Sequence, residues 1–140
     1  MAASLTNAAE AMVLDWLFTA NAPSPARPTT WYVALFTTTP GETGGGTEVS
    51  GGAYARQAVT FTRSGTAPTQ VANSAQIEFP TATANWGTIT GAAIVDASSA
   101  GNMLAYGDIL NPVDSTVSPQ AINTGNIFRF NAGDLVVTCD

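Results

Sequence analysis

The most informative stretch of the chain reads WYVALFT, from Trp31 to Thr37. Its residues are apolar at almost every position, so both faces of a β-strand built from them would be covered. A strand with one wet face would instead alternate apolar and polar residues. We therefore expect residues 31–37 to form a central strand of a sheet.

Shorter strand patterns follow this one, separated by turn-forming residues. Ala75, Ile77 and Phe79 alternate with polar neighbours, as in a strand with one wet face. Other strands are expected at residues 54–62, 86–95, 103–109, 121–130 and 135–138, with turn clusters such as 98–102 and 131–134 between them. This spacing predicts a mainly β fold, an antiparallel, jelly-roll-like β-sandwich.

A helical pattern precedes the strands. Asn7 is the expected N-cap, and Glu10 lies at the capping-box position three residues later. The apolar residues that recur at three-to-four spacing are Met12, Val13, Trp16, Leu17 and Ala20. We expect one short N-terminal helix over residues 7–18.

The segment after the helix is predicted to be an extended tether. Residues 21–28 contain Pro23, Pro25 and Pro28, whose fixed φ and missing N–H groups favour an extended chain. The predicted organisation is a helix and proline-rich tether in residues 1–28 and a β-sandwich domain in residues 29–140. Because so short a helix is marginal alone, the face with Met12, Trp16 and Leu17 should pack against something. Its own sheet and a neighbouring molecule are both left open.

A glycine-rich stretch at residues 38–52 is expected to be an irregular, mobile surface loop. Glu42 and Glu48 lie in it, and they could hold a calcium ion only with further oxygen ligands, which no spaced acidic motif supplies. We count both glutamates as candidate interaction residues. Arg56, near the start of a strand, is a third, paired with a carboxylate of a neighbouring subunit or of its own chain.

The composition argues against several classes of protein. Four arginines and no lysine stand against ten acidic residues, a net charge of −6, so there is no basic surface for nucleic acid. Residues 1–18 have no basic segment and are interrupted by Asn7, Glu10 and Asp15, so neither a signal peptide nor a membrane span is expected. We expect no direct nucleic-acid partner and no membrane partner.

Catalytic and metal-binding groups are scarce. The chain has no histidine and a single cysteine, Cys139, which removes the usual general base and a thiolate metal cluster. Asp96 and Asp108 could form a glycosidase pair, but turn formation explains them better. We expect no catalytic residue, no bound metal and no cofactor, and therefore no enzyme.

Four aromatic residues suggest a second possible function, carbohydrate binding. Trp31, Tyr32, Trp86 and Tyr106 could stack against sugars if they lie on an exposed sheet face. Residues of this kind more often lie in cores and interfaces. Carbohydrate binding is therefore kept as an alternative.

Several segments resemble a family of small virion proteins of tailed bacteriophages, often labelled tail-fibre-like. The resemblance rests on Trp31–Thr37 with the loop that follows, on Tyr54-Ala55-Arg56, on Asn85-Trp86-Gly87 and on residues 130–135. It extends from the helix to the last strand. Related small sandwich proteins serve as capsid decoration or cement proteins, and the same fold also occurs in tail parts.

The resemblance implies a structural virion protein. The first expectation is a capsid decoration or cement protein that stabilises the major capsid protein shell as a symmetric homo-oligomer, made in the host cytoplasm and located on the capsid surface. The alternative is a tail or tail-fibre component that contacts tail proteins and binds host-surface carbohydrate. In either case the helix and the glycine-rich loop are expected to make the contacts.

Overall fold

A computed structural model of the chain describes residues 1–66, 68–111 and 113–139. Within these residues one helix, α1 (Asn7–Phe18), accompanies a set of short strands, which confirms the mainly β fold with an N-terminal helix. The strands are β1 (Ala2–Leu5), β2 (Trp31–Thr38), β3 (Thr47–Glu48), β4 (Gln57–Val59), β5 (Phe61–Ser64), β6 (Thr69–Asn73), β7 (Ile77–Glu78), β8 (Gly87–Ile89), β9 (Gly91–Val95), β10 (Met103–Asp108), β11 (Gln120–Ile122), β12 (Arg129–Phe130) and β13 (Val136–Cys139).

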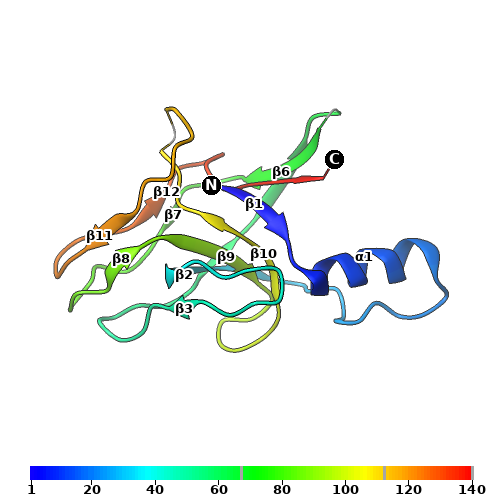
Figure 1. Cartoon of the computed structure of the whole chain (residues 1–140), viewed down its shortest axis with the longest axis horizontal. Helices are drawn as coiled ribbons and strands as arrows, with labels where there is room; N and C mark the ends of the chain where they lie inside the picture. The colour runs from blue at the N-terminus through cyan, green and yellow to red at the C-terminus, as the bar shows by residue number, and fades with distance from the viewer. Residues whose placement is uncertain (67, 112, 140) are drawn as a thin grey trace.

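Most of these strands belong to one sheet. Hydrogen-bonded neighbours follow the order β3-β2-β9-β10-β1-β13-β6-β5, and β4 pairs with the first half of β2. Neighbours run antiparallel, as predicted, except that β1 and β13 are parallel. Two further antiparallel pairs, β7 with β12 and β8 with β11, extend one end of the molecule (Figure 1).

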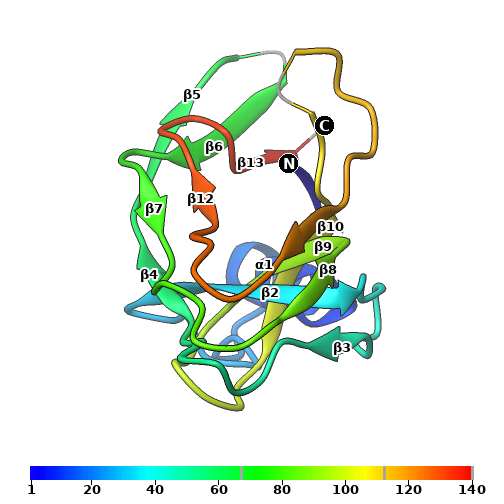
Figure 2. The ribbon, with the colours of Figure 1, turned by 90° about the vertical axis from the view of Figure 1, so that its left-hand side faces the viewer.

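Residues 57–64 bring the two ends of this sheet together. β4 and β5 follow one another with a break only at Thr60, and they pair with β2 and β6 respectively. At the break, the carbonyl oxygen of Thr60 accepts the N–H of Ser74 at 2.9 Å. The sheet therefore curls back on itself, and its inner faces enclose one core (Figure 2). This arrangement is the sandwich-like architecture that the strand spacing predicts.

Strand β2 is the central strand that its sequence predicts. Val33 and Leu35 point into the main core, whereas Ala34 and Phe36 point to a second cluster on the outer face. All four are buried, which explains why the strand is apolar on both sides. The main core also contains an aromatic group formed by Tyr54, Phe79, Trp86, Phe128 and Phe130.

The first residues of the chain belong to the sheet, which the sequence pattern did not indicate. Ala2 of β1 pairs with Val136 of β13, and Ser4 pairs with Tyr106 of β10. Ala3 is buried in the main core. The division at residue 28 stays a prediction, but β1 lies among the sandwich strands rather than apart from them.

Helix α1 spans the predicted residues but has a different cap. The hydroxyl oxygen of Thr6 accepts the N–H of Ala9 at 3.3 Å, and the hydroxyl donates to the carbonyl oxygen of Met103 at 2.6 Å. Asn7, the predicted cap, is the first helical residue, so Glu10 is not at the capping-box position. Thr6 is preferred because β10 fixes its side chain, a contact between distant parts of the sequence.

Two other local predictions are corrected. The expected strands at residues 54–62, 86–95 and 121–130 each break, at Thr60, at Thr90 and over residues 123–128, and the parts pair with different partners. The glycine-rich stretch is not irregular throughout, because β3 pairs with β2 and the N–H of Val49 donates to the carbonyl oxygen of Leu35 at 3.0 Å. Residues 47–49 are therefore part of the sheet and its border.

Candidate functional site

The N-terminal arm, defined as residues 7–28, projects from the body of the molecule. In Figure 1, α1 leaves the strands at its first turn, and the proline-rich tether returns alongside it. The helix packs against β10 and β1, and Ala9 is its buried residue. The large apolar residues beyond the first turn are exposed: Val13 40%, Leu14 57%, Trp16 68%, Leu17 54% and Phe18 78%.

The helix and the tether enclose a shallow apolar groove of about 340 Å³. It is lined by Met12, Val13, Trp16, Pro23, Arg27, Pro28 and Trp31. Of the three predicted interaction residues on the helix, Met12 is half-buried in this groove, whereas Trp16 and Leu17 remain mostly exposed. The molecule's own sheet therefore covers the start of the helix and leaves its last two turns largely exposed.

Leu14 and Phe18 are exposed residues that the sequence analysis did not select. The predicted apolar face comprised residues 12, 13, 16, 17 and 20, whereas α1 is apolar on nearly all sides. A helix that is apolar all round is normally enclosed by other elements. The apolar residues on several sides of the helix therefore indicate that Leu14 and Phe18 also contact a partner.

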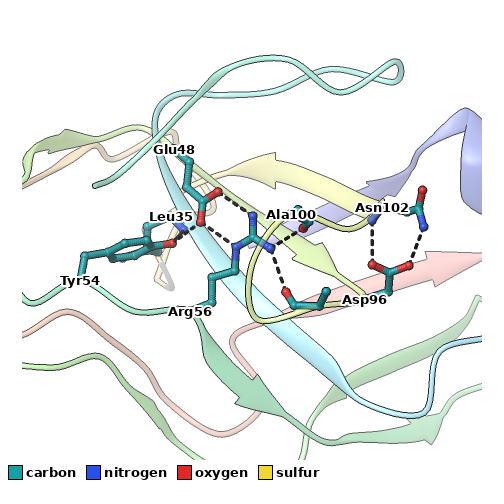
Figure 3. Close-up of polar contacts among 8 residues, drawn as sticks. Leu35, Glu48, Tyr54, Arg56, Asp96, Ala100 and Asn102 are labelled. Carbon is teal, nitrogen blue, oxygen red and sulfur yellow. Dashed lines mark hydrogen bonds and ion pairs between the residues drawn. The ribbon is translucent and has the colours of Figure 1, made fainter. Parts of the chain in front are cut away.

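Two of the other predicted interaction residues, Glu48 and Arg56, form a polar cluster with Tyr54 beside β3 (Figure 3). The Arg56 guanidinium binds both carboxylate oxygens of Glu48, with each N···O distance 2.7 Å, and donates to the carbonyl oxygens of Ala97 and Ala100 at 2.8 and 2.7 Å. The Tyr54 hydroxyl donates to Glu48 at 3.0 Å and accepts the N–H of Leu35 at 2.9 Å. The cluster thus joins the glycine-rich stretch to the β9–β10 turn.

The hydrogen bonds of this cluster hold parts of the same chain together. The Arg56 side chain is only 10% exposed, and of the two pairings left open for it, the structure shows the one within its own chain. Burial alone would raise the pKa of Glu48, but hydrogen bonds from Arg56 and Tyr54 outweigh it and lower that pKa. Burial raises the pKa of Tyr54, which keeps its hydroxyl protonated as a donor.

Glu42 lies apart from this cluster and next to the arm. Its side chain is exposed, and its backbone carbonyl oxygen accepts the N–H of Asn7 at 3.1 Å. The glycine-rich stretch and the arm therefore meet at the base of α1. Contact of Glu42, Glu48 or Arg56 with a partner molecule stays a prediction.

The carboxylate pair considered for glycoside hydrolysis is not assembled. Asp108 is paired with Gly91 at one end of β9, and Asp96 follows the other end of that strand. Five residues of extended chain separate them by about 16 Å, well beyond the spacing of glycosidase carboxylates. Asp96 instead accepts two hydrogen bonds from Asn102 within the β9–β10 turn.

The aromatic residues considered for sugar stacking are not exposed together. Trp86 is buried and donates its indole N–H to the carbonyl oxygen of Gly52 at 2.9 Å. Trp31, Tyr32 and Tyr106 are half-buried and pack against the two apolar clusters.

A separate cleft of about 740 Å³ contains Asn111, Gln120, Asn131, Ile122, Phe128 and Phe130 among its lining residues, and both of its phenylalanines are buried.

In residues 1–66, 68–111 and 113–139, no three His, Cys, Asp or Glu side chains gather as they would around a metal ion. Within the same part of the chain, no helix has the length and apolar character needed to cross a bilayer.

Comparison with protein families places the chain. Residues 4–138 match the family model described as Podophage GP4 fiber I protein gp80. The chain belongs to this family. It is therefore a fibre or virion structural protein of a tailed bacteriophage, as the resemblance in its sequence implies. No curated protein matches the chain.

Proposed function

We propose that the chain is a structural subunit of a phage fibre and that its N-terminal arm fastens it to its partners. The observation that carries this proposal is the exposed apolar surface of α1, with Phe18 78% and Trp16 68% exposed. Large apolar patches of this kind on soluble proteins mark interaction sites. The description of the matching family supports the fibre as the location.

The proposed role is assembly without catalysis. The chain has no histidine, and Asp96 and Asp108 lie at opposite ends of β9. The partners that we propose are tail proteins and further copies of the chain. Carbohydrate binding is not part of the proposal, because the four aromatic residues considered for it are buried or half-buried.

Capsid decoration, the first expectation from the sequence, remains the second candidate. The exposed arm suits it equally, because decoration proteins must also bind a symmetric shell. In that case the main partner is the major capsid protein.

Gold labelling of purified virions with an antibody against this chain separates the candidates. We expect gold on fibres attached to the tail. Gold over the head shell would favour capsid decoration, and absence of the chain from purified virions would contradict both candidates. A preparation that lacks the primary antibody serves as the control.

A further inference from the structure

The cleft of about 740 Å³ lies at the end of the molecule opposite the arm. Strands β11 and β12 contribute to its lining, and Figure 1 shows both of them on the far side of the molecule from α1. Figure 2, which views this end directly, shows β11 and β12 beside the opening of the curled sheet. The mouths of β-barrels are common places for ligand sites, which usually have volumes of about 300–1,000 Å³. The cleft therefore has the place and the size of a ligand site.

Three side-chain amides at the cleft are each held in place by one of their two polar atoms. Asn111 accepts a backbone N–H through Oδ1 at 2.9 Å. Gln120 donates from Nε2 to the carbonyl oxygen of Ser118 at 3.1 Å, and Asn131 donates from Nδ2 to Asp134 Oδ2 at 3.0 Å. Within the described residues the second atom of each amide has no partner, so Asn111 presents a donor and the other two amides present acceptors. Groups that are fixed before a ligand arrives lower the cost of binding it.

The cleft also offers apolar surface beside these amides. Ile109, Ile122, Phe128 and Phe130 line it and belong to the main core, so its base is closely packed. Ile127 also lines the cleft and is 37% exposed, which leaves part of its side chain for contact with a ligand. A few placed polar groups on an otherwise apolar surface are typical of small-molecule sites. A matching ligand therefore has polar groups for the amides and C–H groups for the isoleucine.

We propose that this cleft binds a neutral oligosaccharide. Each hydroxyl group of a sugar both donates and accepts a hydrogen bond, so it can bind the donor of Asn111 and the acceptors of Gln120 and Asn131. The C–H face of a sugar ring packs against Ile127. The cleft is separate from the four aromatic residues considered above for sugar stacking, because its lining residues include none of them.

The charges at the cleft favour a neutral ligand over an acidic one. Among the described residues, Arg129 is the one basic side chain that lines the cleft, and its Nε atom already binds Glu78 at 2.7 Å. The amino group of Met1 donates to the carbonyl oxygen of Asp134, whose own side chain is acidic. The whole chain carries a net charge of −6, which repels anions. Sites for phosphate or carboxylate ligands instead use charged, two-pronged contacts from arginine.

The position of the cleft suits a ligand outside the virion. If the arm fastens the chain to the fibre, the cleft faces away from the attachment point, because the two lie at opposite ends of the molecule. A surface polysaccharide of the host bacterium is then the expected source of the sugar. This orientation rests on the proposed function, whereas the class of ligand rests on the cleft alone.

Nuclear magnetic resonance of the isotope-labelled full chain tests the site directly. The probes are neutral and acidic polysaccharide fragments released from the surface of the host bacterium and, separately, a set of free neutral disaccharides. With the neutral probes we expect shifts in the side-chain amide signals of Asn111, Gln120 and Asn131 and in the backbone signal of Ile127, but not in the signals of the arm. The affinity should change little between about 0.05 M and about 0.5 M NaCl, because no ion pair forms with a neutral sugar. Binding of the fragments without the disaccharides would identify the host polysaccharide as the source.

A substitution at Gln120 tests whether the amides bind the sugar. Gln120→Ala should weaken binding about tenfold, because the ligand loses a fixed acceptor. Gln76→Ala is the matched control, since Gln76 is also an exposed glutamine but lies outside the cleft. Circular dichroism should show both variants folded, because both side chains are exposed.

Three outcomes would overturn the proposed sugar site. They are the absence of shifts with every probe, shifts with the acidic fragments alone, and equal affinity of Gln120→Ala and the wild type for the neutral probes. These experiments use isolated protein, so their failure leaves gold labelling of the fibre unaffected. Conversely, gold over the head shell would contradict the proposed fibre location but not the binding of sugar by the cleft.

Discussion

At the residue scale, the Glu48–Arg56 pair shows what one sequence can and cannot reveal. Glu48 was selected from the sequence as an acidic residue of the glycine-rich stretch, and Arg56 as a charged residue near the start of a strand. Their partnership depends on the pairing of β3 with β2 and on the path of the β9–β10 turn. Those contacts join positions far apart in the sequence. The sequence could therefore indicate that Arg56 pairs with a carboxylate, but not whether that carboxylate belongs to the same chain or to a neighbouring subunit.

Removing Arg56 should destabilise the protein measurably. Arg56→Ala leaves the partly buried Glu48 carboxylate without its two charged hydrogen bonds and frees two carbonyl oxygens, so we expect a loss of about 2 kcal/mol in the free energy of unfolding. Arg129→Ala is the matched control, because the Arg129–Glu78 pair is half exposed and should contribute less than about 1 kcal/mol. Urea denaturation measures both, and equal losses would contradict this account of the cluster.

The same cluster should make stability depend on acidic pH. The folded protein holds the pKa of Glu48 below its ordinary value of 4.5, because hydrogen bonds from Arg56 and Tyr54 outweigh the effect of burial. The carboxylate's contribution is therefore fully present above about pH 4.5 and lost as the pH falls through the folded pKa. We expect thermal melts from pH 7 to pH 3 to show a smaller fall in stability for Glu48→Gln than for the wild type. Identical pH profiles would show that this carboxylate is not perturbed.

At the element scale, strong periodic patterns were predictable and short paired segments were not. Strand β2 was found because it is apolar on both faces, and α1 because of its three-to-four spacing. β1 and β3 are too short to show an alternation of their own, and they exist because other strands offer them edges. Thr6 was not predicted as the N-cap because its side chain is fixed by a hydrogen bond to β10, which is distant in the sequence.

Substitutions at the start of α1 should distinguish the two possible caps. Thr6→Ala removes the acceptor for the Ala9 N–H and the hydrogen bond to Met103, so we expect a loss of about 1–2 kcal/mol in unfolding free energy. Asn7→Ala should cost less than about 0.5 kcal/mol, because Asn7 is exposed and already helical. Midpoints of urea unfolding provide the comparison, and a larger loss for Asn7→Ala would restore Asn7 as the cap.

At the scale of the whole molecule, the sheet depends on a strand from the very start of the chain. β1 joins β10 to β13, and without it the strand order would be interrupted at its middle. The sandwich class could be predicted from the spacing of strand and turn signals. The closure could not, because β1 pairs with β13 from the other end of the chain and because residues 57–64 divide between two partners, β2 and β6.

Gly107 should be essential for the insertion of β1. A methyl group at this position would collide with the backbone carbonyl oxygen of Ala2, so we expect Gly107→Ala to cost about 2 kcal/mol or more in unfolding free energy. Gly41→Ala is the control, since a methyl group there meets no atom within 4 Å. Thermal denaturation of both variants checks this, and a Gly107→Ala chain as stable as the wild type would mean that β1 is not held against β10.

We propose above that the exposed helix holds this protein in the virion. The most direct measurement is the copy number of the chain in purified phage particles, determined by quantitative mass spectrometry when a host supplies only one variant. Leu17→Arg should be present at less than about a tenth of the wild-type amount. Val113→Arg is the control and should match the wild type, because Val113 is also an exposed apolar residue but lies outside the arm. Incorporation of Leu17→Arg at the wild-type level would show that the apolar surface of α1 is not the assembly contact.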